Sequence, residues 1–274
     1  MKRLAAILMV LALGTVVLGG EPLRPPYPEL TFLFTSAATL PGEIRGVEVR
    51  CRCGRSVAVD EWIEYPDPAG RIQSFAFDPL NPRLYFTRPG SGAIWVVHFS
   101  PGGPLPAWVL YRHPTPVADL ALRVEGGEAV LYFSSVAPDS GEGAIFRLLP
   151  NGMAEAVMRI AWQPDRFYWD GFFAFDPEGT LYLSSGGRLP GRLWRWEERG
   201  PVEVARIQGR RIGGFLLFDP WVVLISDLDG GVWKLDLREG VPVEIYRSRG
   251  RFRISDVGLY PAWWDALWDP MGRR

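Results

Sequence analysis

One strand pattern recurs five times along this 274-residue chain, and no other feature of the sequence limits the fold as strongly. In each copy an apolar strand ends in a hydroxyl residue that is followed by a second polar residue. The copies are FLFTS, LYFTR, LYFSS, LYLSS and VLISD, with equivalent hydroxyls at Thr35, Thr87, Ser134, Ser184 and Ser226. Each copy continues through a glycine-containing loop into a second strand and through a polar turn into a third. Units of about 40 to 50 residues with four strands each are typical of β-propeller blades.

The first copy lacks one strand, and this exception predicts how the ring closes. In the other four copies an additional apolar segment precedes the hydroxyl strand, and the first copy follows a proline-rich stretch instead. An unused segment of the same kind, ISDVGLY, spans residues 254–260 near the other end of the chain. We expect this C-terminal strand to join the N-terminal blade, because that pairing would remove an open sheet edge. The predicted fold is an all-β propeller of four-stranded antiparallel blades, with five blades favoured, six as the alternative, and a β-sandwich as the competing architecture.

The first 20 residues predict export. Met1-Lys2-Arg3 is followed by an uncharged apolar run that ends in small residues, which is the composition of a secretory signal peptide. A retained membrane anchor is the alternative, because the run approaches the length that spans a bilayer. The expected organisation is a signal peptide (1–20), a proline-rich leader (21–29), a single propeller (30–261) and a tryptophan-rich tail (262–274). After cleavage we expect a secreted or periplasmic monomer without membrane contact.

The charge balance excludes one class of partner. Thirty basic residues face 31 acidic ones, so the net charge of −1 supplies no field that would attract nucleic acid. An apolar fraction of 47% excludes a disordered chain. Lysine occurs only at Lys2 and Lys234, so nearly all the basic residues are arginines, which fits either a thermophilic protein or a GC-rich genome.

The aromatic residues divide into two groups. One residue in the second strand of four copies occupies an equivalent place, and large rings there are expected to pack between blades; these residues are Trp95, Phe146, Trp194 and Trp233. Trp263, Trp264 and Trp268 fall outside the repeat. We expect them to cap one face of the ring, with an exposed aromatic patch as the alternative.

Carboxylates at the start of the inner strands are the first candidate site. Asp119 and Asp256 occupy the same position in their copies, Asp170 lies two residues earlier in its own copy, and the matching residues elsewhere are Ser74, Phe172 and Phe215. Three carboxylates from three blades could converge at the channel mouth and hold a hard cation such as Ca²⁺, or act as acid and base. The alternative is that each carboxylate caps its own turn.

The loops after the hydroxyl strands all lie on one rim and provide further candidates. Four charged residues there could orient an anionic or hydroxylated ligand, or simply be solvated: Arg88, Arg188, Asp227 and Asp229. His98 and His113 are the only histidines, which excludes a histidine-rich metal site. The absence of a GxSxG motif leaves a Ser-His-Asp triad without support. Cys51 and Cys53 lie on one side of a strand, where a local disulfide, a soft-metal site or free thiols are the options, and export favours the disulfide.

The string FDPEGTLYLSSGGRLPGRLWRW (175–196) resembles the blade pattern of the senescence-marker-protein/gluconolactonase family and of NHL-repeat propellers. The gluconolactonase branch implies six blades, one divalent cation in the channel and hydrolysis of sugar lactones, and Asp170-Gly171 is similar to that family's Asp-Gly. The NHL branch implies a ring that binds a ligand or protein. We therefore expect a non-catalytic propeller that binds a small molecule or protein through the loop rim and channel mouth. A metal-dependent lactone or ester hydrolase is the alternative.

Overall fold

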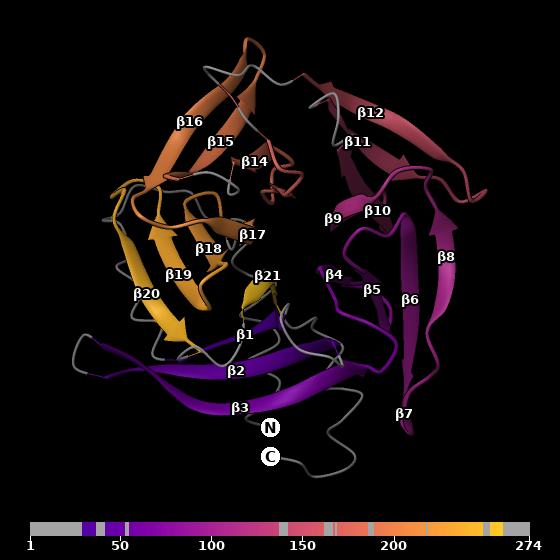
Figure 1. The fold of residues 1–274 in the computed structure, drawn as a ribbon, viewed down its shortest axis with the longest axis horizontal. Coiled ribbons are helices and arrows are strands. Elements are labelled where there is room, and N and C mark those ends of the chain that lie inside the picture. Colours follow the sequence, from indigo (N-terminus) through magenta and orange to yellow (C-terminus); the bar gives the residue numbers. More distant parts are fainter. Residues whose placement is uncertain are drawn as a thin grey trace.

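The chain forms a five-bladed β-propeller, as the repeat predicts. A computed structural model describes residues 29–36, 42–52, 55–136, 142–161, 167, 169–185, 189–217, 219–248 and 253–259. In Figure 1 the blades surround a common centre, and each blade is an antiparallel sheet built on four strands. Within the described ranges every regular element is a strand. The prediction of five blades rather than six is confirmed.

Each blade runs from an inner strand at the centre to an outer strand at the periphery. Blade 1 consists of β21 (Ile254–Gly258), β1 (Glu29–Ser36), β2 (Gly42–Arg52) and β3 (Arg55–Asp67). Blade 2 consists of β4 (Ser74–Phe77), β5 (Arg83–Thr87), β6 (Ala93–Ser100) and β8 (Trp108–Arg112), with the short β7 (Gly103–Pro104) also paired to β6. Blade 3 consists of β9 (Val117–Glu125), β10 (Glu128–Val136), β11 (Gly143–Leu148) and β12 (Ala154–Ile160). Blade 4 consists of β13 (Phe173–Phe175), β14 (Leu181–Ser185), β15 (Gly191–Glu197) and β16 (Gly200–Ile207). Blade 5 consists of β17 (Ile212–Leu217), β18 (Val222–Asp227), β19 (Gly231–Asp236) and β20 (Pro242–Arg247).

The ring closes through blade 1, whose inner strand comes from the end of the chain. β21 pairs antiparallel with β1, with Val257 opposite Phe34 and Gly258 opposite Leu33. The predicted closure by residues 254–260 is therefore confirmed, with the strand itself ending at Gly258. This pairing covers the inner edge of β1, which would otherwise expose unpaired backbone groups.

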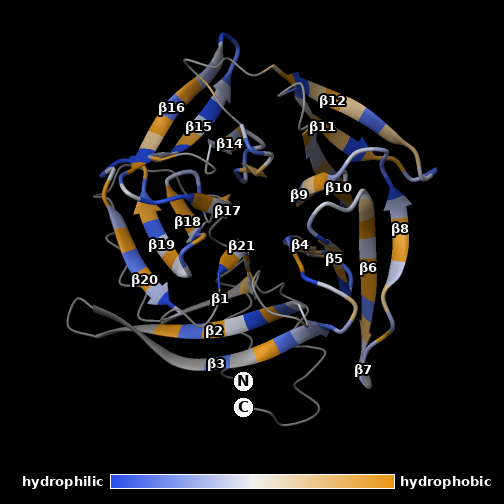
Figure 2. Ribbon diagram, in the orientation of Figure 1, coloured by the Kyte–Doolittle hydropathy of each residue, from blue (hydrophilic) through white to orange (hydrophobic). Residues whose placement is uncertain are grey.

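The hydrophobic core is divided among the interfaces between neighbouring blades. Five clusters of buried apolar side chains are present among the described residues, and each joins two adjacent blades. Figure 2 correspondingly shows hydrophobic segments in every blade. The four equivalent rings pack into four of these clusters, as predicted: Trp95, Phe146, Trp194 and Trp233.

The recurring hydroxyls are buried and most of them tie a blade to an inner strand. All five have no exposed surface. Ser226 Oγ donates to the carbonyl oxygen of Gly214 at 2.8 Å, and Ser134 Oγ donates to that of Gly171, just before the inner strand of the next blade, at 2.5 Å. The Thr35 hydroxyl lies 2.5 Å from the Ser255 hydroxyl on β21. A short side chain that can hydrogen-bond at this depth explains why the pattern ends in serine or threonine.

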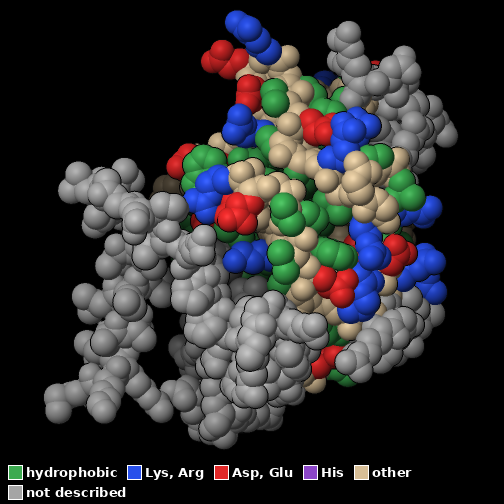
Figure 3. All heavy atoms as spheres, turned by 90° about the vertical axis from the view of Figure 1, so that its left-hand side faces the viewer, with side chains coloured by type: hydrophobic (Ala, Val, Ile, Leu, Met, Phe, Trp, Pro, Cys, Tyr) green, Lys and Arg blue, Asp and Glu red, His purple; other side chains and the backbone are tan. Residues whose placement is uncertain are grey.

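The outer surface carries charges of both signs side by side. On the side of blades 4 and 5, Figure 3 shows arginine and acidic side chains interspersed. Ion pairs there include Arg206 with Glu203 and Arg247 with Glu244. This arrangement agrees with the balanced composition and offers no extended basic surface on that side.

Several predictions concern residues outside the described ranges and stay predictions. They are the signal peptide (1–20), the leader up to residue 28, the tail with Trp263, Trp264 and Trp268, and Arg188. Cys51 lies in β2 opposite Ser56, whereas Cys53 is outside the described residues, so the disulfide stays untested. The described part of the chain contains no helix long and apolar enough to cross a membrane.

Candidate functional site

Two buried aspartates and one serine occupy equivalent positions on three consecutive inner strands. Asp256 of blade 1, Ser74 of blade 2 and Asp119 of blade 3 have exposures of 4%, 0% and 3%. Blade 5 differs from the sequence alignment: Phe215 pairs with Ile225 after an irregularity in the ladder, which leaves Gly214 opposite the hydroxyl Ser226. Gly214 rather than Phe215 is therefore the equivalent residue. A Cβ atom there would lie 1.9 Å from Asp256 Oδ1, so only glycine leaves room for the carboxylate.

The two carboxylates bridge neighbouring blades at the centre of the ring. Asp256 Oδ2 accepts a hydrogen bond from the backbone N–H of Phe75 at 3.0 Å, which links blade 1 to blade 2. Asp119 Oδ1 accepts from the Ser74 hydroxyl at 2.6 Å, and its Oδ2 accepts from the N–H of Phe173 at 2.8 Å, which links blades 2, 3 and 4. An inner strand is a sheet edge whose N–H groups need acceptors when they are buried. Asp119 and Asp256 supply those acceptors.

Burial and mutual repulsion raise the pKa of both carboxyl groups. Burial is the main cause for Asp119, and the charge of Asp170 adds to it, so that the pKa rises from 3.8 to about 7. Burial also raises the pKa of Asp256 well above 3.8, and the neighbouring charge of Asp119 raises it further. Two buried carboxylates that repel each other retain a proton at a pH where exposed aspartates are ionised.

These carboxylates do not fit the predicted calcium site. All four oxygens of Asp119 and Asp256 accept hydrogen bonds from the fold, the last of them from the N–H of Val257 to Asp256 Oδ1. Asp170 Oδ1 accepts from the Ser184 hydroxyl at 3.2 Å. Ca²⁺ requires six to eight oxygen ligands. Within the described ranges, no three His, Cys, Asp or Glu side chains are placed to hold one metal ion.

Of the three predicted rim charges that the structure describes, two have partners within the fold and one is exposed. Arg88 donates two hydrogen bonds to buried Asp67, at 2.8 and 2.9 Å. Asp227 is 1% exposed and accepts hydrogen bonds from two backbone N–H groups of its own loop and from the indole of Trp233. Asp229 is exposed. Arg88 and Asp227 therefore hold the rim together and are not aimed at a ligand.

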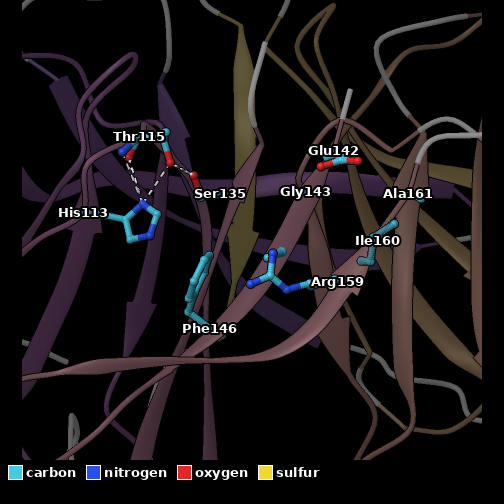
Figure 4. Close-up of a pocket in the computed structure, with 10 residues that line it drawn as sticks. His113, Thr115, Ser135, Glu142, Gly143, Phe146, Arg159, Ile160 and Ala161 are labelled. Carbon is cyan, nitrogen blue, oxygen red and sulfur yellow. Dashed lines mark hydrogen bonds between the residues drawn. The ribbon is translucent and has the colours of Figure 1, made fainter. Parts of the chain in front are cut away.

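A pocket of about 300 Å³ opens on the same rim between blades 2 and 3. It is lined by His113, Thr115, Ser135, Glu142, Gly143, Ala144, Phe146, Arg159, Ile160 and Ala161. Figure 4 shows the Phe146 ring between His113 and Arg159, with Ser135 near its upper edge and Glu142 across the opening. Of these residues, only His113 and Phe146 stand out in the sequence, and neither is predicted there to bind a ligand.

The interface between blades 1 and 2 shows which side chains fill the space that corresponds to this pocket. We define a rim triad as three residues that meet at one interface between blades. The first lies at the end of the outer strand of one blade. The other two belong to the next blade: the residue that follows its recurring hydroxyl, and the residue at its equivalent ring position. Between blades 1 and 2 the rim triad is Asp67, Arg88 and Trp95. The Arg88 guanidinium lies 4.0 Å from the Trp95 ring centroid while it pairs with Asp67. An ion pair and an indole thus fill that interface.

Between blades 2 and 3 the rim triad is His113, Ser135 and Phe146. The His113 ring packs on Phe146 with centroids 4.6 Å apart. Ser135 is much shorter than Arg88, and a phenyl ring is smaller than an indole. The pocket therefore exists because two side chains at this interface are smaller than their counterparts at the interface before it.

A hydrogen-bonded chain fixes His113 at the edge of the pocket. His113 Nδ1 lies 3.0 Å from the Thr115 hydroxyl, which lies 2.5 Å from the Ser135 hydroxyl. Ser135 Oγ in turn donates to the carbonyl oxygen of Pro116 at 2.9 Å. When Nδ1 carries the imidazole proton it donates to the Thr115 hydroxyl and Nε2 is an acceptor, whereas in the other tautomer Nδ1 accepts from the Thr115 backbone N–H. Burial lowers the pKa of His113, which favours the neutral imidazole.

Comparison with solved structures supports the fold. A structure of a nidogen/laminin complex aligns with a TM-score of 0.52 and 14% identity, over 83% of this chain and 97% of that chain. A gluconolactonase-like protein aligns with a TM-score of 0.48 and 19% identity, over 84% and 85%. TolB from Acinetobacter baumannii aligns with a TM-score of 0.48 and 12% identity, over 81% and 53%. No family model matches the sequence, and no curated protein matches it. The alignment with the nidogen/laminin structure supports the β-propeller fold, which hosts many unrelated functions.

Proposed function

We propose that this protein is an exported, non-catalytic β-propeller that binds a small ligand in the rim pocket between blades 2 and 3. The observation that carries the proposal is the pocket itself, about 300 Å³ in volume and lined by aromatic, hydroxyl and charged side chains. Pockets of this size and mixed lining are typical of small-molecule sites. Its location agrees with the rim expected from strand direction.

The centre of the ring is a poorer candidate for the site. Its two carboxylates are buried, and each oxygen accepts a hydrogen bond from the fold. A hydrolase that used Asp119, Asp170 and Asp256 would need those oxygens for a metal ion or for proton transfer. Ligand binding at the rim does not require these hydrogen bonds to break.

Export belongs to the same proposal. It rests on the basic, apolar and small-residue order of the first 20 residues. Cell fractionation of the native protein, followed by N-terminal sequencing of the exported form, tests it. A mature N-terminus after residue 20 supports cleavage, and an intact N-terminus in the membrane fraction supports the anchored alternative.

A fragment screen tests the pocket. Ligand-observed NMR with a few hundred chemically diverse fragments would compare the wild-type protein with Phe146→Trp, which restores the indole that other blades carry at this position. The control is Leu110→Trp, which adds an indole at an exposed position of β8, outside the pocket lining. We expect fragments that bind to the wild type and to L110W but not to F146W. A hit list that is identical for all three proteins would refute the proposal.

A further inference from the structure

We infer that the rim pocket binds an indole-type aromatic carboxylate. The inference rests on the proposed function and adds the chemical class of the ligand. Three observations support it, and two of them come from comparing blade 3 with equivalent positions in other blades.

The first observation concerns the hydrogen-bond acceptor for an indole N–H. In blade 4 the Trp194 indole N–H donates to Ser185 Oγ at 3.1 Å, and in blade 5 that of Trp233 donates to Asp227 Oδ2 at 2.7 Å. Ser135 is the equivalent residue in blade 3, and its neighbour Phe146 has no N–H to donate. Ser135 Oγ donates to Pro116 and accepts from the Thr115 hydroxyl, so one of its two lone pairs remains to accept an N–H in the place where two other blades bind an indole.

The second observation concerns aromatic surface. Phe146 stacks on Phe133 with centroids 5.0 Å apart and an interplanar angle of 13°, and His113 covers another part of the ring. On the side of β11 the pocket is bounded by Gly143 and Ala144, which project little or no side chain into it. A flat ring can therefore lie against Phe146 and His113, because planar aromatic groups stack well in such a space.

The third observation concerns Arg159. In blades 4 and 5 the equivalent arginines, Arg206 and Arg247, pair with a glutamate three residues earlier, Glu203 or Glu244. In blade 3 the register places Ala156 at the glutamate position, opposite Phe146. Among the described residues, none forms an ion pair or hydrogen bond with the Arg159 side chain. Arginine binds carboxylates through two parallel hydrogen bonds, so an anionic ligand group fits here.

The pocket also restricts the charge of the ligand. Glu142 lines the same opening as Arg159, so the pocket holds one positive and one negative side chain. A second carboxylate on the ligand would lie near the Glu142 carboxylate at a cost. The structure thus favours a monocarboxylate.

Isothermal titration with the intact protein tests the chemical class. The probes are indole-3-acetate, 1-methylindole-3-acetate, which lacks the N–H, and cyclohexaneacetate, which lacks the aromatic ring. We expect indole-3-acetate to bind, the methylated probe to bind about tenfold more weakly because a hydrogen bond is lost, and cyclohexaneacetate to show no heat of binding. Equal affinity for cyclohexaneacetate and indole-3-acetate, or no binding of indole-3-acetate, would overturn the inference.

Two variants test the role of Arg159. Arg159→Gln removes the charge, and Ala156→Glu restores the glutamate that blades 4 and 5 carry, at an exposed position where misfolding is not expected. Each should weaken indole-3-acetate binding about tenfold, as expected for the loss of a charge-assisted hydrogen bond. Arg206→Gln in blade 4 is the matched control and should bind as the wild type does. Unchanged affinity in both R159Q and A156E would overturn the assignment.

The failure of this inference can be distinguished from that of the proposed function. If fragments bind in a manner that F146W blocks but indole-3-acetate does not bind, the pocket is a ligand site for another chemical class. If F146W leaves every fragment hit unchanged, the pocket is not a ligand site, and the inference fails with the proposed function.

Discussion

Asp119→Asn should flatten the dependence of stability on pH. The pKa of Asp119 is raised from 3.8 to about 7, chiefly by burial, so between these pH values the folded protein binds more protons than the unfolded chain. Stability from this group is therefore fully present below about pH 4 and is lost as the pH rises through 7. A shift of this size corresponds to about 4 kcal/mol, of which about 3 kcal/mol falls between pH 5 and 8.

Asparagine can occupy the same site without titrating. With its Oδ1 accepting the N–H of Phe173, its amide can donate to the Ser74 hydroxyl, whose proton is then directed toward Asp256. Removing the Asp119 charge also removes one of the causes that raise the pKa of Asp256. We expect D119N to match the wild type at pH 5 to within about 1 kcal/mol, the usual size of one altered hydrogen bond, and to be the more stable protein at pH 8.

Urea unfolding followed by tryptophan fluorescence at pH 5, 6, 7 and 8 measures this difference. Asp236→Asn is the control, because the Arg238 side chain lowers the pKa of Asp236 to about 2 and its contribution is lost only in stronger acid. D236N should therefore retain the wild-type slope between pH 5 and 8. The same slope in D119N and wild type would refute the assignment of a protonated carboxyl group at the centre of the ring.

Three further substitutions test other contacts, each by urea unfolding. Gly214→Ala should destabilise the fold by about 2 to 4 kcal/mol, because the new Cβ would lie 1.9 Å from Asp256 Oδ1, whereas Gly102→Ala, with its nearest atom at 3.8 Å, should have little effect. Thr87→Val should leave stability unchanged or raise it by about 1 kcal/mol, because the buried Thr87 hydroxyl has no hydrogen-bond partner among the described residues. Ser226→Ala should lower stability by about 1 kcal/mol, because it removes the hydrogen bond to the Gly214 carbonyl oxygen. Arg88→Lys should lose about 1 to 2 kcal/mol, because a lysine cannot make both hydrogen bonds to Asp67 and also stack flat on Trp95, and wild-type stability would contradict that reading.

The fold could be predicted from the sequence because each blade repeats the same local pattern. The hydroxyl strand recurs with a buried Ser or Thr at its end, and the missing first strand of blade 1 reappears as residues 254–260. Propeller blades contact only their neighbours, so the local pattern and the number of copies determine the ring. The misalignment at Phe215 arose because the ladder of β17 and β18 is irregular, a feature that side-chain periodicity does not reveal.

The charged candidates illustrate a different limit of sequence reasoning. Asp119, Asp256, Arg88 and Asp227 are in positions where a polar residue could serve either a ligand or the fold. The deciding facts are backbone N–H groups and partners from other blades, such as Phe75 for Asp256 and Asp67 for Arg88. Those two pairs are separated by 181 and 21 residues along the chain, and no motif connects them, whereas the partners of Asp227 lie in its own loop and the strand that follows.

The pocket was detectable in principle from the repeat itself, read for its exceptions. Of the four equivalent rings only Phe146 is not a tryptophan, and two other positions of blade 3 carry a smaller side chain than some of their counterparts: Ser135, as in blade 4, where blade 2 has Arg88, and Ala156 where blades 4 and 5 have glutamate. Each exception alone is a minor change in side-chain size. Because the propeller places all three around one interface, together they leave a space, an acceptor and a guanidinium that has no ion-pair partner among the described residues. A repeat protein can thus acquire a binding site at one interface by loss of the contacts that fill the others, without any new structural element.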